Sequence, residues 1–146
     1  MRLRDALASL PDIDHEIIDW LAEINSYKGV CTLNSCAGHN NHYNQPFVIL
    51  AFSKGSPFHK FCHEISPVRS DVSPVLTLFS DKGWVAVFPP TKDISVEQGS
   101  GVTPERLPTV RRDLFERIIA TLEKVIERKA SVKEIERKIK VLGRGL

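Results

Sequence analysis

The stretch Phe47–Phe52, which reads Phe-Val-Ile-Leu-Ala-Phe, decides the fold of this chain. An apolar run of this length, without polar alternation, is typical of a strand buried on both faces of a sheet. Two further apolar runs, 74–79 and 84–88, flank the polar segment Ser80–Gly83. Because apolar runs around a glycine-containing turn are typical of an antiparallel hairpin, we expect two more strands there. A short β-type run at 30–33 completes the predicted sheet.

Helices are predicted before, between and after these strands. Residues 12–26 and 108–129 carry apolar side chains at the three- and four-residue spacings of an amphipathic helix. Asp12 or Asp14 is suited to cap the first of them, because a short side-chain oxygen accepts a free backbone N–H. A shorter helix is expected at 58–65, where the chain follows a Ser-Pro pair.

The last helix is predicted from its start signal. Ser131–Glu134 reads Ser-Val-Lys-Glu, the pattern of a capping box, and opens a helix that reaches residue 142. The order of elements predicts an α/β (α+β) fold, with one mixed sheet and helices packed on it. We expect a single domain over 1–146, since 146 residues is close to the usual size of one domain. Its C-terminal region, 108–142, is predicted to be helical.

Composition and charge narrow the class of protein. Hydrophobic residues make up 42% of the chain and charged residues 26%, which is ordinary for a globular protein. The net charge of +2 permits contact with RNA or a phosphorylated ligand, but it is not the dense basic stripe of a dedicated nucleic-acid-binding protein. No apolar run approaches the roughly 20 residues that cross a membrane, and the first residues do not resemble a signal peptide. Three cysteines, an odd number, favour reduced thiols, so we predict a cytoplasmic protein without membrane contact.

The side chains best suited to chemistry are crowded into one part of the chain. All three cysteines and four of the five histidines lie between residues 31 and 63. Cysteine and histidine are the side chains most used as nucleophiles, as bases near neutral pH and as metal ligands. We therefore expect the functional site in this region.

Its predicted centre is the segment 34–39, which reads Asn-Ser-Cys-Ala-Gly-His and follows a strand. Ligands of α/β sheets often bind just beyond the carboxyl ends of strands. Gly38 allows a positive φ angle, Ser35 and the loop N–H groups suit an anion, and His39 suits a base or a cationic group. The predicted catalytic residues are Ser35, Cys36 and His39. The predicted ligand-binding residues are Thr32, Asn34, Gly38 and Trp84, whose ring is suited to stack on a base.

Three other interpretations remain open. The spacings Cys36-x-x-His39 and His59-x-x-Cys62 suit a tetrahedral zinc ion, as in a metal-binding protein or a hydrolase. Alternatively, Cys36 is a nucleophile activated by a histidine, or it is buried and inert. In the third interpretation the helical region 108–142 docks a partner or a second copy of the chain. The protein would then be a homo-oligomer or a non-enzymatic interaction module.

Residues 20–52 resemble the N-terminal part of the TYW3-type family of tRNA wybutosine-synthesising proteins. The likeness is carried by Glu-Ile-Asn-Ser at 23–26, by Thr32 and by Ser-Cys-Ala-Gly-His at 35–39. In that family a helix ending in Ile-Asn-Ser leads to a Thr-x-Ser-Ser-Cys-Ser-Gly-Arg-like motif. Its members are small α/β proteins found in archaea and eukaryotes.

The resemblance implies a small nucleotide- or RNA-ligand-binding protein that methylates a tricyclic guanosine precursor in phenylalanine tRNA. It implies S-adenosylmethionine as the cofactor and tRNA as the partner. Ser35, Cys36 and Gly38 would occupy the motif positions of the family. Asn34 stands where the family favours serine, and His39 stands where it has arginine, so a permanent cation is replaced by a titratable ring.

Overall fold

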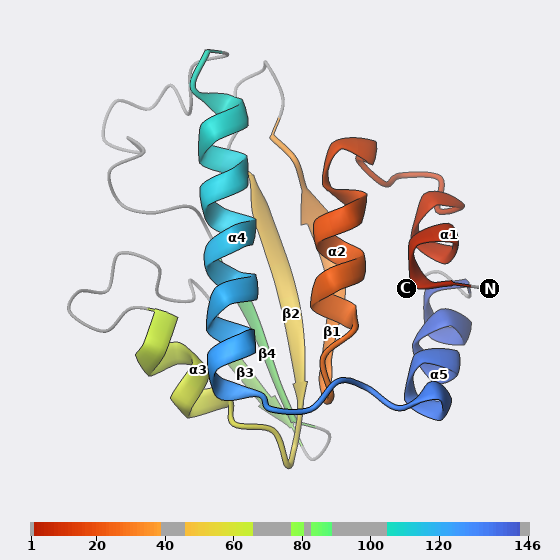
Figure 1. The fold of residues 1–146 in the computed structure, drawn as a ribbon, viewed down its shortest axis with the longest axis vertical. Helices are drawn as coiled ribbons and strands as arrows, with labels where there is room; N and C mark the ends of the chain where they lie inside the picture. The colour runs from red at the N-terminus through yellow and green to blue at the C-terminus, as the bar shows by residue number, and fades with distance from the viewer. Residues whose placement is uncertain (1, 39–45, 66–76, 81–82, 89–104, 144–146) are drawn as a thin grey trace.

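The computed structural model describes residues 2–38, 46–65, 77–80, 83–88 and 105–143, which form helices and one sheet (Figure 1). The elements are α1 Leu3–Ala8, the 3₁₀ helix η1 His15–Ile17, α2 Ile18–Asn25, β1 Val30–Cys36, β2 Phe47–Ser53, α3 Phe58–Ile65, β3 Thr77–Ser80, β4 Gly83–Phe88, α4 Leu107–Val125 and α5 Val132–Gly143. The predicted α+β fold with helices at its C-terminal end is confirmed. None of the described helices is long and apolar enough to span a membrane.

The four strands form one sheet in the order β1-β2-β4-β3, and every neighbouring pair is antiparallel. The sheet is therefore antiparallel where a mixed one was expected. For the pairs β1–β2 and β3–β4 the reason lies in the connections, because ten residues separate β1 from β2 and two separate β3 from β4. A parallel pair needs a crossover of about a dozen residues or more, which these connections do not provide. The predicted hairpin is confirmed as β3 and β4, with Gly83 at a φ of +133°.

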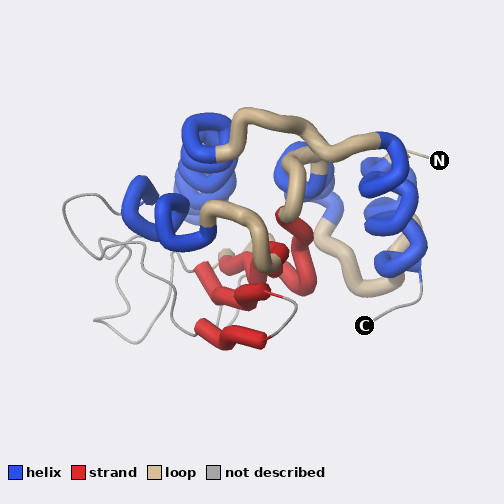
Figure 2. Tube along the Cα trace, turned by 90° about the horizontal axis from the view of Figure 1, so that it is seen from below, coloured by secondary structure: helices blue, strands red, loops and turns tan. Residues whose placement is uncertain are grey.

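The core lies between one face of the sheet and helices α2, α3 and α4, as Figure 2 shows from below. The side chains of β2 alternate between buried and half-buried positions accordingly. Val48, Leu50 and Phe52 are at most 1% exposed, whereas Ile49 and Ala51 point to the other face and are half-buried. No described helix covers that second face. The expectation of a strand buried on both faces is therefore wrong, because only one face packs into the core.

The N-terminal helices differ from the prediction. α1 was not predicted, although Leu3, Ala6 and Leu7 bury its inner side. A helix of six residues offers too few apolar repeats to show a period, and it forms here through packing on α2 and α5. The helix predicted over 12–26 begins with the 3₁₀ turn η1 and becomes α-helical only at Ile18. The side chain of Asp14 makes no cap bond to either helix.

The C-terminal helices turn back on the start of the chain. α4 ends at Val125, four residues earlier than predicted, because the backbone of Ile126 is extended (φ −116°, ψ 108°). α5 then lies beside α1, next to the β1 edge of the sheet (Figures 1 and 2). The Ser131 hydroxyl accepts the Glu134 N–H at 3.1 Å, which confirms the predicted helix start. The Glu134 carboxylate does not close the capping box. It accepts the Gly29 N–H at 2.7 Å instead.

Candidate functional site

The predicted centre of the site begins in a strand and not in a loop. β1 continues to Cys36, and Ser35 and Cys36 pair with Val48 and Phe47 of β2. The strand exceeds the predicted 30–33 because β2 supplies partners as far as Cys36, with an irregularity between Thr32 and Asn34. Beyond the strand, Gly38 is buried and has a φ of +85°, as predicted. His39 and His42 lie outside the described residues.

The backbone just after β1 is anchored from two sides at Ala37. The Asp14 carboxylate accepts the Ala37 N–H at 2.8 Å, and the Arg111 guanidinium donates to the Ala37 carbonyl at 2.8 Å. This explains why Asp14 does not cap a helix. The two bonds tie the end of β1 to η1 and to the first turns of α4 and fix the position of Gly38.

The Cys36 thiol beside this anchor is not activated. Burial raises the pKa of Cys36, and the nearby Asp14 carboxylate raises it further. The Gly38 N–H, which donates to the sulfur at 3.3 Å, and the Arg111 cation act in the opposite direction but do not reverse the shift. Since the thiolate is the nucleophile and the metal ligand, Cys36 is held in its less reactive form at neutral pH.

The predicted ligand-binding residues are not gathered in one place. Thr32 is buried and bonded to Asn25 through both its N–H and its hydroxyl. Asn34 is exposed, and its side-chain oxygen accepts the Ser35 N–H at 2.8 Å. Trp84 pairs with Phe52, whose other partner is Val30 at the beginning of β1. It is therefore about 20 Å from the Ser35–Gly38 end, the length of six strand residues.

The four predicted zinc ligands are also divided. The His59 ring meets the edge of Trp84 with centroids 4.8 Å apart, at the Val30 end of the sheet, whereas Cys36 ends β1 on the opposite side. Burial raises the pKa of Cys62 to about 11, which disfavours the thiolate that zinc requires. Within the described ranges, no three Cys, His, Asp or Glu side chains come together as a metal site. His39, the remaining predicted ligand, lies outside those ranges.

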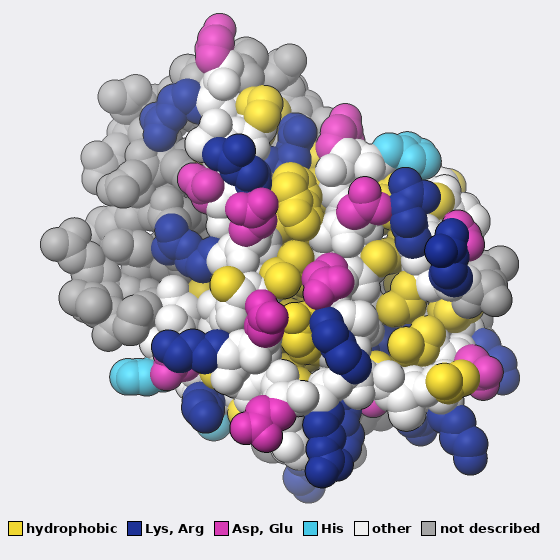
Figure 3. All heavy atoms as spheres, in the orientation of Figure 1, with side chains coloured by type: hydrophobic (Ala, Val, Ile, Leu, Met, Phe, Trp, Pro, Cys, Tyr) yellow, Lys and Arg dark blue, Asp and Glu magenta, His cyan; other side chains and the backbone are white. Residues whose placement is uncertain are grey.

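Two cavities lie at the Val30 end of the sheet, opposite the predicted site. The first, called the basic cavity, has a volume of about 440 Å³ and lies between the turn after β2 and the end of α4. Its lining includes four cationic side chains and two serines: Lys28, Lys60, Lys124, Arg128, Ser53 and Ser56. In Figure 3, Lys and Arg side chains gather along the lower rim of the molecule, with acidic side chains among them.

The second, called the apolar cavity, has a volume of about 450 Å³ and lies between the sheet and α5. Its lining includes Val30, Cys31, Ala51, Phe52, Trp84, Val85, Glu134, Arg137 and Lys138. Burial raises the pKa of the Cys31 thiol, so this side chain is a neutral part of the lining. Lys28, Gly29 and Ser53 line both cavities and form the wall between them.

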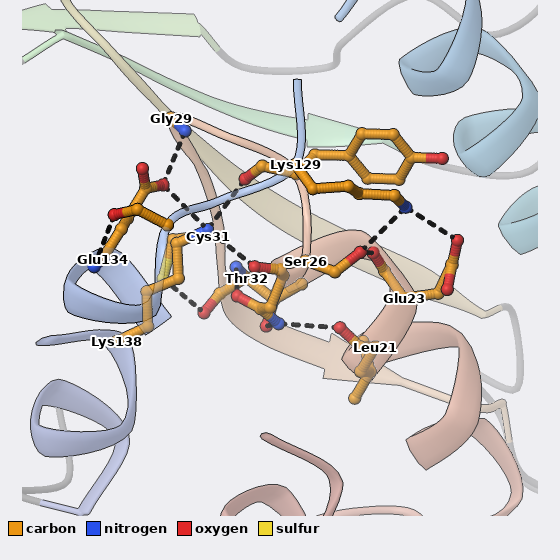
Figure 4. A network of polar contacts seen from close by, with 12 residues as sticks. Leu21, Glu23, Ser26, Gly29, Cys31, Thr32, Lys129, Glu134 and Lys138 are labelled. Atoms are coloured by element: carbon orange, nitrogen blue, oxygen red, sulfur yellow. Dashed lines mark hydrogen bonds and ion pairs between the residues drawn. The ribbon is translucent and has the colours of Figure 1, made fainter. Parts of the chain in front are cut away.

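A polar network fixes this wall to α5 (Figure 4). Lys138 is 8% exposed, and its ammonium donates to the carbonyls of Asn25 and Tyr27 at 2.7 and 2.9 Å. It also pairs with the Glu134 carboxylate at 3.2 Å, and that carboxylate accepts the Gly29 N–H. Burial lowers the pKa of Lys138, and Glu134 opposes the shift. We call Glu134 and Lys138 the α5 anchor.

A second lysine supports the same turn. The Lys129 ammonium lies 3.6 Å from the centroid of the Tyr27 ring and donates to Glu23 and Ser26, each at 3.1 Å. A cation over an aromatic face is favourable, and here it covers a tyrosine that is 3% exposed. The turn between α2 and β1 is thus fixed by two lysines from the C-terminal part of the chain.

The residues that line the two cavities were not predicted from the sequence as site residues, apart from Trp84 and the region that contains Cys31. The basic cavity is assembled from residues near 28, 53–60 and 124–128, and no local pattern connects them. The Glu and Lys residues of α4 and α5 alternate, which is the ordinary pattern of a solvated helix face. Comparisons of the chain with protein-family models, with curated proteins and with solved structures found no match.

Proposed function

We propose that this protein binds a nucleotide or RNA ligand, and that the basic cavity holds its phosphate groups. The observation that supports the proposal is the convergence of four cationic side chains, Lys28, Lys60, Lys124 and Arg128, on one polar cavity. Ammonium and guanidinium groups bind phosphate oxygens through charge-assisted hydrogen bonds.

The charges of the basic cavity do not cancel. Lys124 pairs with Glu64 at 2.8 Å, and Glu127 also lines the cavity. Four cations against these two carboxylates leave an excess of two positive charges. Lys28 and Arg128 form no ion pair with any described group, so their charges are available to a ligand. An uncompensated cluster of this kind favours a polyanion over a single carboxylate.

Transfer RNA is the ligand we propose, in keeping with the family resemblance described above. An RNA presents a row of phosphates, and each contact to a lysine or arginine releases a bound counterion. The exposed Lys54, in the same turn as Ser53 and Ser56, extends the positive surface beyond the cavity. The cavity would then receive one or two phosphates of a larger interface.

The experiment measures tRNA binding at salt concentrations from about 50 to 250 mM. The readout is the fluorescence anisotropy of end-labelled phenylalanine tRNA. We expect Arg128→Gln and Lys60→Gln each to weaken binding and to lower the slope of log K against log salt by about 1. The matched control is Arg117→Gln, an exposed arginine on α4 outside both cavities, which should bind as the parent does.

Two outcomes would contradict the proposal. One is the absence of tRNA binding even at the lowest salt concentration, where electrostatic contacts are strongest. The other is an equal loss of affinity in the Arg117 control, which would show a diffuse charge effect and not a site. Circular dichroism of each variant verifies that the fold is retained.

The same titration tests the site predicted from the sequence. If residues 34–39 bind the ligand, Ser35→Ala and His39→Ala abolish tRNA binding without unfolding the protein. If the basic cavity is the phosphate site, Ser35→Ala binds as the parent does, because Ser35 lies at the opposite end of β1 from Lys28. The two sets of variants therefore separate the two locations.

Methyl transfer from S-adenosylmethionine is the finer part of the proposal and depends on the resemblance alone. Nucleoside sites commonly use a free carboxylate to bind ribose hydroxyls. In the apolar cavity the carboxylate of Glu134 is already occupied by the Gly29 N–H and by Lys138. The apolar cavity therefore offers no free Glu134 carboxylate for this cofactor, and we derive no transfer step. Isothermal titration with S-adenosylmethionine tests the prediction, and tight binding would support the methyltransferase interpretation.

A further inference from the structure

The floor of the apolar cavity is a row of three small side chains that crosses the sheet. Cys31 is directly opposite Ala51 on β2, and Ala51 is directly opposite Val85 on β4. All three are half-buried and alternate with residues that point into the core, so they face away from the main helices. Because alanine is smaller than the cysteine and the valine on either side of it, the row leaves a depression at Ala51.

The side wall of this cavity is α5, and its charges are already satisfied. Glu134 and Lys138 pair with each other, and their remaining bonds go to Gly29, Asn25 and Tyr27. A ligand group would have to break these buried bonds to reach either charge, at a cost of several hydrogen bonds. The α5 anchor is therefore a neutral wall toward the cavity interior.

The rim of the cavity has a different character. Arg137 of α5 and Lys28 of the α2–β1 turn line the cavity and are exposed. Neither forms an ion pair with a described group. The apolar cavity thus combines an apolar floor, a neutral wall and two cations at its opening.

We infer that the apolar cavity is a separate binding site for a small, flat aromatic molecule that carries one acidic group. Its volume of about 450 Å³ lies within the range of small-molecule sites. The ring system lies on Ala51 and Val85, where it buries apolar surface. The acidic group lies at the rim and accepts hydrogen bonds from Arg137. This inference does not depend on phosphate binding at the basic cavity.

The test is a titration of ¹⁵N-labelled protein with 2-naphthoate, monitored by the shifts of backbone amide signals. We expect the amides of Cys31, Ala51 and Val85 to move together and to saturate. The neutral analogue 2-naphthalenemethanol should shift the same amides but bind about fivefold more weakly, because it lacks the contact with Arg137. Absence of saturable shifts at this row, or shifts centred elsewhere, would overturn the inference.

Substitutions at Ala51 and Arg137 test separately the contact with the ring and the contact with the acidic group. Ala51→Phe fills the depression and should abolish the shifts with naphthoate, and Arg137→Gln should reduce the affinity for naphthoate to that for the alcohol. Arg117→Gln serves again as the control. If Ala51→Phe does not fold, the Arg137→Gln result still decides, since that side chain is exposed. Naphthoate binding that is unchanged in Arg137→Gln would refute the role of the acidic group.

The outcome is distinguishable from that of the proposed function. Arg137→Gln should leave the salt slope of tRNA binding unchanged, because Arg137 does not line the basic cavity. Loss of tRNA binding with intact naphthoate binding would count against the basic cavity alone. Loss of naphthoate binding with intact tRNA binding would count against the apolar cavity alone.

Discussion

At the scale of single residues, Asn25 is the side chain on which the start of the sheet depends. It is fully buried, and its amide donates to the Leu21 carbonyl and to the Thr32 hydroxyl, each at 2.8 Å. Its carbonyl accepts the Thr32 N–H at 3.0 Å. Since β1 is an edge strand, this side chain replaces the neighbouring strand that would otherwise pair with Thr32. Asn25 and Thr32, which both contribute to the family resemblance, therefore stabilise the start of the sheet.

Asn25→Ala should lower the free energy of unfolding by about 2–4 kcal/mol, because it leaves the buried N–H and hydroxyl of Thr32 without partners. Urea unfolding followed by circular dichroism measures the change. Asn34→Ala is the matched control on the same strand. Its side chain is exposed, so we expect a change within about 0.5 kcal/mol. Equal effects of the two substitutions would contradict this role of Asn25.

At the scale of elements, the hairpin of β3 and β4 packs against β2 so closely that one position excludes any side chain. A Cβ atom at Gly83 would lie 1.9 Å from the carbonyl oxygen of Phe52, and the φ of +133° is itself unfavourable for other residues. Gly55, in the turn after β2, has no atom within 4 Å of the same position and does not have a positive φ. The two glycines form a matched pair.

Gly83→Ala should destabilise the protein by at least about 3 kcal/mol, since both the backbone angle and the contact with Phe52 must change. Gly55→Ala should change the stability by no more than about 0.5 kcal/mol. Thermal unfolding of the two variants side by side measures the difference. A Gly83→Ala protein as stable as the parent would mean that the hairpin does not approach β2 as described.

The elements were predictable from the sequence to the extent that their signal is local. The apolar run of β2, the glycine turn before β4 and the Ser131 cap each identify an element without reference to the rest of the chain. The extension of β1 to Cys36 was not predictable, because it depends on the backbone of β2 and on the two bonds at Ala37. α1 has no periodic signal and forms through its packing on α2 and α5.

At the scale of the whole molecule, the chemistry predicted from residue types and the cavities found in the fold lie at opposite ends of the sheet. The cysteines and histidines between 31 and 63 are close together in the sequence, but Cys31 and Cys36 lie near opposite ends of β1, and His59, Cys62 and His63 lie on α3. The cavities are built from residues up to 110 positions apart, such as Lys28 and Lys138. Such assemblies depend on tertiary packing, which no local pattern reports.

The stability of the whole fold at alkaline pH should depend on its half-buried thiols. Burial raises the pKa of Cys62 from 9.0 to about 11, so the folded state keeps a proton that the unfolded state loses. The resulting stability is fully present below pH 9.0 and is lost as the pH rises through about 11. Burial raises the pKa of Cys31 and Cys36 as well, which acts in the same direction.

Replacing Cys62 by alanine should make the stability less sensitive to alkali. A folded-state pKa of about 11 against 9.0 corresponds to at most about 2.7 kcal/mol, and solvent around the half-buried thiol reduces this to about 1 kcal/mol. Urea unfolding at about pH 8 and about pH 11 therefore should show a smaller loss in Cys62→Ala than in the parent. Identical losses would show that Cys62 titrates alike in both states.

The α5 anchor also determines when the N-terminal part of the chain can complete its structure. The N–H of Gly29 and the carbonyls of Tyr27 and Asn25 find their partners 105, 111 and 113 residues later in the sequence. During synthesis, the turn that leads into β1 must therefore wait until residue 138 has left the ribosome. Contacts of such long range are formed late, because the chain must first lose the entropy of closing the intervening loop. The wall between the two cavities would accordingly be the last part of the fold to become rigid.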